Sequence, residues 1–377
     1  MRPRVVYWNN IPAPYMVERF NALFERGNVD LEVWFSTRTE SDRSWHVAEE
    51  SWRFPYRYLP AIPGRRATTI PLPALRARPD VLVSLYASPS FMLGSTVARL
   101  RGIRTAYWVE VTFDAWITRR RWKERLKSKL LPRADAIMTA GRDGAAFAMR
   151  YGVSPERILT VPHVIDFDRY ARGSAVARAT REAMRSRLGL HGVTFAYVGR
   201  LWSGKGLDQL LDAFAALKRE NTRDVSLLLV GDGVDEARLR KRCADEGLED
   251  VVFAGFHDGD ALHPLYASAD VFVFPTLGDP FGMVVLEAMA CGLPVISTSA
   301  AGEIADRIDE GLNGFVVPPA DVEALRARMG LLADDKSLRS RMAEAATAKV
   351  AAQSPHLWAE AFEEAVDKLL ALPTIRS

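Results

Sequence analysis

The amino-acid sequence predicts an α/β fold made of two doubly wound domains. A chain of 377 residues is too long for one ordinary hydrophobic core, which indicates two domains. In both halves, short apolar runs of strand length alternate with helical stretches, as is typical of parallel sheets covered by helices. In the second half these runs are apolar throughout, as expected of strands buried on both faces.

The first half opens with a strand, a turn and a helix, the order in which a doubly wound sheet begins. The apolar run RVVYW at 4–8 leads through a proline-containing turn to an amphipathic helix over 16–24. Further strands are expected at 31–35, 81–86, 105–111, 136–140 and 158–161, with a helix at 91–100. Residues 38–56 mix aromatic and charged side chains and are expected to form an irregular loop.

The second half contains six apolar runs that predict the strands of one parallel sheet. They begin at Thr194, Val225, Val251, Val271, Pro294 and Gly314, and helices are expected to begin at Gly206, Asp235, Leu262, Gly282, Gly302 and Asp321. Ligands of such sheets bind at the carboxyl ends of the strands, beside the helix starts. We therefore expect two such edges to face each other across a cleft between the domains.

The composition is that of a soluble globular protein, with 48% hydrophobic and 26% charged residues. Two cysteines, Cys243 and Cys291, argue against a disulfide framework and against a cysteine-based metal site. They fit a reducing cytoplasm, and the sequence contains neither a visible targeting segment nor the roughly 20 apolar residues that a membrane span requires. The expected location is the cytoplasm.

A basic segment at 119–132 stands out in the first half of the chain. Residues 1–170 carry 27 Lys and Arg against 17 Asp and Glu, whereas the rest of the chain carries 23 against 30. Within 119–132, Trp122, Leu126 and Leu130 recur at helical spacing among seven basic side chains. The segment is either a solvated helix face or a helix that lies on an anionic membrane surface. Nucleic acid is disfavoured because no base-reading motif accompanies the charge.

Glu287 is an acidic residue within an otherwise apolar helix, in the stretch DPFGMVVLEAMACG at 279–292. A helix that is apolar all round is expected to be buried, and a carboxylate buried there without a partner is costly. The turn at 280–282 precedes the helix, so its free N–H groups attract an anion. The stretch therefore predicts a site for a ligand with hydroxyls and phosphates; the alternative is a salt bridge from Glu287 to a core arginine.

A second candidate is the turn GRLWSGKG at 199–206, which joins a strand to a helix. It resembles the phosphate-binding loop of ATPases, but Gly206 stands where that loop needs Ser or Thr for magnesium. Its glycines let a phosphate approach the backbone, and Arg200 and Lys205 supply two cations. The alternative is a pair of surface charges. Similar turns at Gly231 and at Phe256 are weak signals alone, but all these turns fall on one edge of one sheet.

Residues 198 to about 321 resemble the nucleotide-binding domain of the family 4 retaining glycosyltransferases. The resemblance rests on VGRLWSGKG, GDG, VVFAGF, an acid eight residues before Glu287, EAMACGLPVIST and GFVVPPAD. It implies a GT-B fold of two Rossmann-like domains. We expect an acceptor-side domain at 1–167, a donor-binding domain at 168–354, and a final helix, within 355–377, that crosses back onto the first domain.

The resemblance also implies roles for individual residues. Arg200 and Lys205 would bind the diphosphate of a UDP- or GDP-type nucleotide sugar, Glu287 the ribose hydroxyls, and Asp279 the transferred sugar. The backbone of Phe281, Gly282 and Met283 would approach the donor, and Gly199, Gly231 and Phe256 would line its site. Asn10 and Tyr15 are assigned to the acceptor side. The cations and the helix start can neutralise the leaving group, so no metal and no cofactor is expected.

The sequence departs from the family pattern at three positions. Asp279 stands where the family usually has Glu, and this shorter acid suggests a different donor sugar. Glu110 stands where many members have a catalytic His and is a candidate replacement for it. His163 lies where the family tends to have Asn, and we expect it to be a connecting residue satisfied by a backbone hydrogen bond.

The function these features predict is retaining transfer of a sugar to a glycan or lipid-linked acceptor in cell-surface polysaccharide or glycolipid synthesis. The basic helix at 119–132 would then hold the enzyme on the inner membrane face. The alternatives are a nucleotide-sugar epimerase on the same fold, an ATPase, and a nucleotide-sugar-binding protein without transfer activity.

Overall fold

A computed structural model describes residues 2–38, 48–60, 78–86, 89–109, 121–220 and 224–375. The contacts divide this part of the chain into two compact units. Of the described residues, unit 1 contains those up to 164 and those from 355 onward, and unit 2 contains those at 165–354. The division thus falls at 164/165, close to the boundary expected at 167/168.

Unit 1 is built on a seven-stranded sheet in which all neighbouring strands are parallel. Its strands are β1 (Arg4–Asn9), β2 (Asp30–Phe35), β3 (Tyr56–Tyr58), β4 (Val81–Leu85), β5 (Arg104–Val109), β6 (Ala136–Thr139) and β7 (Ile158–Thr160), in the order β3-β2-β1-β4-β5-β6-β7. The order reverses between β1 and β4. The strand β3 was not predicted, because this short edge strand lies in the aromatic and charged stretch that we expected to be irregular.

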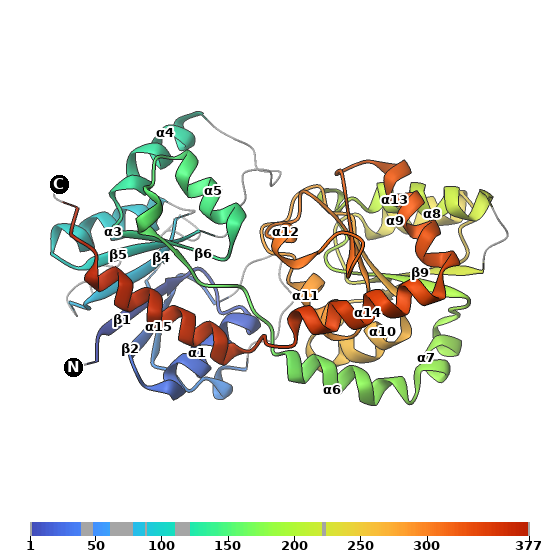
Figure 1. The fold of residues 1–377 in the computed structure, drawn as a ribbon, viewed down its shortest axis with the longest axis horizontal. Helices are drawn as coiled ribbons and strands as arrows, with labels where there is room; N and C mark the ends of the chain where they lie inside the picture. The colour runs from blue at the N-terminus through green and yellow to red at the C-terminus, as the bar shows by residue number, and fades with distance from the viewer. Residues whose placement is uncertain are drawn as a thin grey trace. The chain divides into compact units, whose positions relative to one another are not determined.

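Helices cover both faces of this sheet (Figure 1). They are α1 (Pro14–Arg26), α3 (Pro89–Leu100), α4 (Arg121–Leu130), α5 (Arg142–Arg150) and α15 (Pro355–Ala371). Helices α1 and α15 share one core with Tyr7, whereas α3 packs on the other face through Phe91. The final helix therefore belongs to the first domain.

Side chains far apart in the sequence hold α15 in place. Trp358 and Phe362 are fully buried and pack around Tyr7. Arg26 forms a salt bridge of 2.9 Å with Glu363, and Arg104 Nη2 donates to the carbonyl oxygen of Leu372 at 2.8 Å. Each large side chain buried in this way contributes about 1.5–3 kcal/mol to stability.

Unit 2 is built on a six-stranded, fully parallel sheet, and all six predicted strands are present. They are β8 (Val193–Val198), β9 (Val225–Val230), β10 (Val251–Gly255), β11 (Val271–Phe274), β12 (Val295–Thr298) and β13 (Gly314–Val317), in the order β10-β9-β8-β11-β12-β13. The order reverses between β8 and β11. Ligands of doubly wound sheets bind at such a reversal, outside the carboxyl ends of the two strands.

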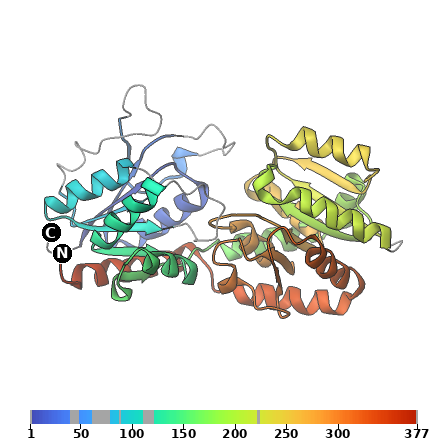
Figure 2. The same cartoon turned by 90° about the horizontal axis from the view of Figure 1, so that it is seen from above.

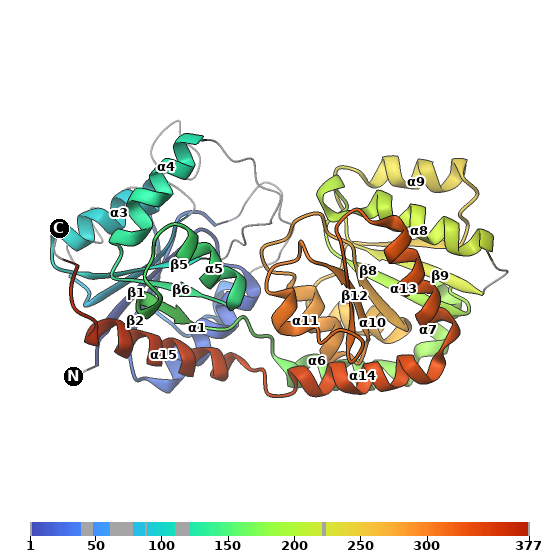
Figure 3. The same ribbon diagram turned by 45° about the horizontal axis from the view of Figure 1, so that its top comes forward.

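The helices of unit 2 form a layer on each side of its sheet (Figures 2 and 3). One layer contains α8 (Leu207–Glu220), α9 (Glu236–Asp245) and α13 (Val322–Asp334). The layer on the opposite face contains α6 (Phe167–Arg178), α10 (His263–Ser268), α11 (Met283–Ala290) and α14 (Lys336–Val350). The short helices α7 (Arg181–Leu188) and α12 (Ile304–Arg307) complete the unit. Across the described ranges, no helix is both long enough and apolar enough to span a bilayer.

Candidate functional site

Two turns meet where the strand order of unit 2 reverses. One follows β8 and contains Lys205, and the other follows β11 and contains Asp279. Their backbones touch, because the N–H of Leu277 donates to the carbonyl oxygen of Gly204 at 3.0 Å. Gly206 has a φ of 69°, and a Cβ there would lie 2.0 Å from the carbonyl oxygen of Pro275. A side chain at 206 is therefore excluded by this contact, which explains why the turn lacks the Ser or Thr of an ATPase loop.

Lys205 and Asp279 form an ion pair that joins the two turns. Their side chains are only 10% and 14% exposed. The other oxygen of the carboxylate, Oδ1, accepts the N–H groups of Phe281 at 2.8 Å and Gly282 at 2.7 Å. Burial acts to raise the pKa of Asp279, but the Lys205 ammonium and these two N–H groups outweigh burial and hold the pKa below its ordinary value.

This geometry gives Asp279 a structural role that the sequence did not reveal. The side chain folds back onto its own loop, a turn that a short acid makes readily through the second and third residues that follow it. The N–H groups of Phe281 and Gly282, which we expected to approach the donor, are already donated to Asp279. Asp279 also places a negative charge at the start of α11, where the helix dipole favours it.

Glu287 has a hydrogen-bond partner within the protein. The hydroxyl of Tyr266 donates to Glu287 Oε2 at 2.9 Å. Tyr266 is fully buried, and burial together with the Glu287 charge raises the pKa of its hydroxyl well above the ordinary value. Sequence reasoning missed Tyr266, because a tyrosine within the apolar run that leads to β11 carries no distinguishing signal.

Helix α11 is less uniformly buried than its composition suggests. Met283, Val284 and Glu287 are partly exposed, whereas Val285, Leu286 and Ala288 to Ala290 are buried. Positions 283, 284 and 287 lie on one face of a helix, since residues three and four apart are neighbours. Glu287 therefore lies on the accessible face of α11, a turn beyond the helix start.

The turns after β8 and β9 are tightly packed against each other. Gly231 has a φ of 132°, and a Cβ there would lie 2.0 Å from the carbonyl oxygen of Gly199. The fully buried Tyr197 donates its hydroxyl to the carbonyl oxygen of Arg200 at 2.9 Å, and the Arg200 guanidinium lies 5.6 Å from the Trp202 ring centre. Phe256, just beyond β10, is 38% exposed.

The unit 1 candidates lie near the carboxyl end of β1 or outside the described residues. Asn10 follows β1, and the ring of Tyr15 lies 5.1 Å from the guanidinium of Arg19. Glu110 lies outside the described residues. Nδ1 of His163 contacts Nη1 of the buried Arg19 at 3.0 Å.

The basic segment is helical over α4, and Arg119 and Arg120 lie outside the described residues. Lys127 is turned toward the molecule: it pairs with Glu124 at 3.0 Å and lies 5.5 Å from the ring centre of Phe147. Arg125 and Lys129 are exposed. Part of the basic charge therefore belongs to the packing of unit 1, and part faces solvent.

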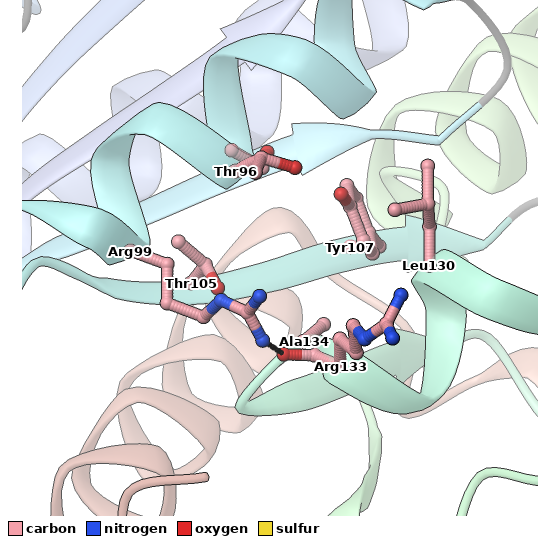
Figure 4. Close-up of a pocket in the computed structure, with 8 residues that line it drawn as sticks. Thr96, Arg99, Thr105, Tyr107, Leu130, Arg133 and Ala134 are labelled. Carbon is pink, nitrogen blue, oxygen red and sulfur yellow. Dashed lines mark hydrogen bonds between the residues drawn. The ribbon is translucent and has the colours of Figure 1, made fainter. Parts of the chain in front are cut away.

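A small cavity lies in unit 1 between α3, β5 and the C-terminal end of α4 (Figure 4). It is lined by Ser95, Thr96, Arg99, Thr105, Tyr107, Leu130, Arg133 and Ala134. Its volume of about 10 Å³ leaves room for about one water molecule, so it cannot hold a nucleotide sugar.

The part of the chain that contains the two turns matches a known protein family. Residues 181–349 match the family described as Glycosyl transferases group 1. This part of the chain is therefore similar to a glycosyltransferase group 1 domain. The matched residues include Lys205, Asp279, Tyr266 and Glu287.

Relatives of the group 1 domain are named as sugar transferases or synthases. A mannosylfructose-phosphate synthase of Agrobacterium fabrum is 34% identical over 187 residues, which cover 48% of this chain and 40% of that protein. A D-inositol 3-phosphate glycosyltransferase of Salinispora arenicola is 31% identical over 208 residues, which cover 52% of this chain and 46% of that protein. The matches thus span less than half of either relative.

A solved structure confirms the predicted fold class, two Rossmann-like α/β sheets as in GT-B proteins. HepE from Anabaena in complex with UDP matches with a TM-score of 0.78 and 18% identity over 97% of this chain and 99% of that chain. Its complex with UDP-glucose matches with a TM-score of 0.77 at the same identity and coverage.

Proposed function

We propose that the protein is a retaining glycosyltransferase that moves a sugar from a nucleotide-sugar donor to a glycan or lipid-linked acceptor. The observation that carries this proposal is the Lys205–Asp279 ion pair at the strand reversal of a group 1 domain. Arg200 borders the same turn, and Glu287 lies on the accessible face of the adjacent α11. Two cations, a carboxylate and a helix start suit a diphosphate attached to a ribose.

In this proposal the catalytic work is the stabilisation of a leaving group. Lys205 and Arg200 bind the diphosphate, Glu287 accepts the ribose hydroxyls, and Asp279 holds Lys205 in place. The bond from the anomeric carbon to the phosphate oxygen breaks, and its electrons remain on the diphosphate. The acceptor oxygen bonds to the same face of that carbon, and the acceptor hydroxyl proton passes to the departing phosphate oxygen. The residues act through charge and positioning.

The donor is of the UDP or GDP type, and the complexes of HepE with UDP and UDP-glucose favour UDP as the first to test. Gly199, Gly231, Phe256 and Met283 would complete the donor site, and Asn10 and Tyr15 would lie on the acceptor side. Glu110 would be a catalytic residue in place of the family's His. We place the enzyme in the cytoplasm, with the exposed basic side chains of α4 against the inner membrane face. An anionic surface attracts such side chains by about 1 kcal/mol each.

A second candidate function is nucleotide-sugar binding without transfer. The fold-back of Asp279 onto its own loop favours it, because the acid then faces Lys205 and the N–H groups of Phe281 and Gly282. A site with this arrangement can hold a diphosphate even if Asp279 does not reach the sugar.

Incubation with a panel of UDP- and GDP-sugars separates these functions. Slow release of free nucleotide, accelerated by a glycan or lipid-linked acceptor, is the result expected of a transferase. Recovery of an epimerised donor would instead indicate an epimerase, and saturable binding with no turnover would indicate a binding protein. Absence of binding to any nucleotide sugar would refute the assignment of the site.

A further inference from the structure

Arg307 is a buried arginine that lies directly behind the Asp279 loop. It is the last residue of the short helix α12, and the residue is only 6% exposed. Its Nη1 donates to the carbonyl oxygens of Phe281 and of Gly282, the latter at 3.0 Å. Hydrogen bonds from a charged donor are about twice as strong as those between neutral groups.

The segment that carries Arg307 is itself tied to the same loop. The N–H of Asp279 donates to the carbonyl oxygen of Ala300 at 3.2 Å, and the N–H of Gly302 donates to the carbonyl oxygen of Asp279 at 2.7 Å. The side-chain amide of Asn313, a buried residue, donates to the carbonyl oxygen of Arg307 at 3.0 Å. The guanidinium thus extends from a backbone that is anchored on both sides.

Residue 303, at the start of α12, shows that this segment is tightly constrained. Glu303 is buried and has a φ of 55°, a left-handed conformation that costs a non-glycine residue about 1–3 kcal/mol. Such a conformation persists only where the surrounding contacts impose it. The backbone at the start of α12, the helix that carries Arg307, is therefore held by its surroundings.

Together, Asp279 and Arg307 bind the polar groups of the loop from opposite sides. Asp279 accepts the N–H groups of Phe281 and Gly282, and Arg307 donates to the carbonyl oxygens of the same two residues. Gly282 is held at a φ of 50°, and a Cβ there would lie 3.4 Å from Arg307 Nη1. The carbonyl oxygen of Gly282 also accepts the N–H of Val285 in the first turn of α11.

We propose that Arg307 is a positioning residue of the donor site, which acts through the loop at 279–282. By fixing the two carbonyl oxygens it sets the start of α11 and the orientation of the Asp279 carboxylate that holds Lys205. Its removal should therefore weaken binding of a nucleoside diphosphate although Arg307 does not itself touch the ligand. This inference rests on the proposed nucleotide-sugar site.

The test compares Arg307, which contacts the loop before α11, with Arg178, which contacts the residue after α11. Arg178 donates to the carbonyl oxygen of Cys291, just after α11, at 2.8 Å. UDP and GDP binding by calorimetry would be compared for the wild type, Arg307→Met, Arg307→Lys and Arg178→Met, well below the melting temperature of each. We expect Arg307→Met to raise the Kd about tenfold, as the loss of one strong contact does. Arg307→Lys should recover part of the affinity, and Arg178→Met should lower the melting temperature with the Kd unchanged.

The outcomes separate the inference from the function on which it rests. A wild type that binds neither nucleotide refutes the proposed function itself. A wild type that binds, with Arg307→Met binding equally well, overturns the role of Arg307 while the function stands. An equal loss in Arg178→Met would also overturn it, because general loosening of α11 would then suffice. If Arg307→Met does not fold, Gly282→Ala is the second variant, since it disturbs the same contact from the loop side; unchanged binding there counts against the proposal.

Discussion

At the scale of single residues, the proposed donor site contains charged groups that already have partners within the protein. Lys205 is held by Asp279, and Glu287 accepts the hydroxyl of Tyr266. A charged group that is already held by a partner needs little rearrangement when a ligand binds, so the site is preorganised. The variants of these residues therefore test binding more directly than folding.

Glu287→Ala should abolish detectable donor binding while the fold survives, because the partly exposed carboxylate contributes to the ligand more than to the core. Calorimetry with a nucleotide sugar measures the first effect and circular dichroism the second. Tyr266→Phe is the matched control, since it removes one hydrogen bond to Glu287 and keeps the charge. It should cost about 0.5–3 kcal/mol of binding. Normal binding by Glu287→Ala would show that the ribose assignment is wrong.

Asp279→Asn should weaken diphosphate binding and lower turnover, because Lys205 loses the carboxylate that holds it in place. The amide oxygen still accepts the N–H groups of Phe281 and Gly282, but the negative charge beside Lys205 and the α11 start is gone. Nucleotide titrations and donor-hydrolysis rates measure the two effects. Lys205→Ala should lose both binding and turnover with little change in melting temperature, and a large drop in that temperature would point to a structural role for the pair.

Because the pKa of Asp279 is lowered, this residue should not make thermal stability depend on pH near neutrality. A carboxyl whose pKa is lower in the folded state stabilises the fold above its ordinary value of 3.8, and this contribution is lost as the pH falls further, through the folded pKa. Between pH 5 and 8, Asp279 therefore stays ionised, and Asp279→Asn should leave the pH dependence of thermal stability unchanged. A different slope for Asp279→Asn in that range, in melting curves across pH, would contradict this expectation.

At the scale of elements, close helix packing in unit 2 depends on Gly173. This glycine lies in α6, where a Cβ would lie 2.0 Å from Nδ1 of the buried His263 on α10. An alanine within a helix normally adds about 0.5–1 kcal/mol of stability relative to glycine. Here the collision should reverse the sign.

Gly173→Ala should lower the free energy of unfolding of unit 2, by about 1–3 kcal/mol for an overpacked contact. Urea unfolding followed by tryptophan fluorescence measures it. The double variant with His263→Ala should recover part of the loss, because the ring that the new methyl meets is then absent. If Gly173→Ala is as stable as the wild type, the two helices are less closely packed than described.

His263 should also make the stability of unit 2 depend on pH. Burial lowers its pKa, Asp260 acts in the opposite direction, and Arg169 lowers it further. As the pH falls below the ordinary value of 6.5, the unfolded chain takes up the proton first, so the free energy of unfolding decreases until the folded pKa is reached. Melting temperatures between pH 8 and 5 should fall less steeply for His263→Gln than for the wild type.

At the scale of the whole molecule, unit 1 depends on a helix from the other end of the sequence. Trp358→Ala should destabilise unit 1 by about 3–5 kcal/mol, since it empties a fully buried site among Tyr7, Phe20 and Trp108. Leu370→Ala, on an exposed position of α15, is the matched control and should change stability little. Calorimetric unfolding should show the loss in one transition, and nucleotide binding by unit 2 should persist in Trp358→Ala.

Much of the fold could be predicted because the strands of unit 2 are apolar runs bounded by glycine and proline. The edge strand β3 was not predicted because its exposed aromatic and charged residues lack that pattern.

Within the site, the hydrogen bonds from Phe281 and Gly282 to Asp279 are local, and an acid two residues before Phe281 could in principle have predicted them. The contacts of Tyr266 with Glu287 and of Arg19 with His163 join residues 21 and 144 positions apart, and only the folded backbone brings them together.

The position of α15 in the core of unit 1 also bears on how the chain folds during synthesis. The strands of unit 2 all lie within residues 193–317, so they have left the ribosome before α15 does. Unit 1 is discontinuous, and its core stays open on one face of the sheet until α15 emerges about 190 residues after β7. Closing a contact across so long a separation is slow, because contacts distant in sequence are costly to form. The second unit is thus able to fold while the first, although synthesised earlier, still exposes an apolar sheet face.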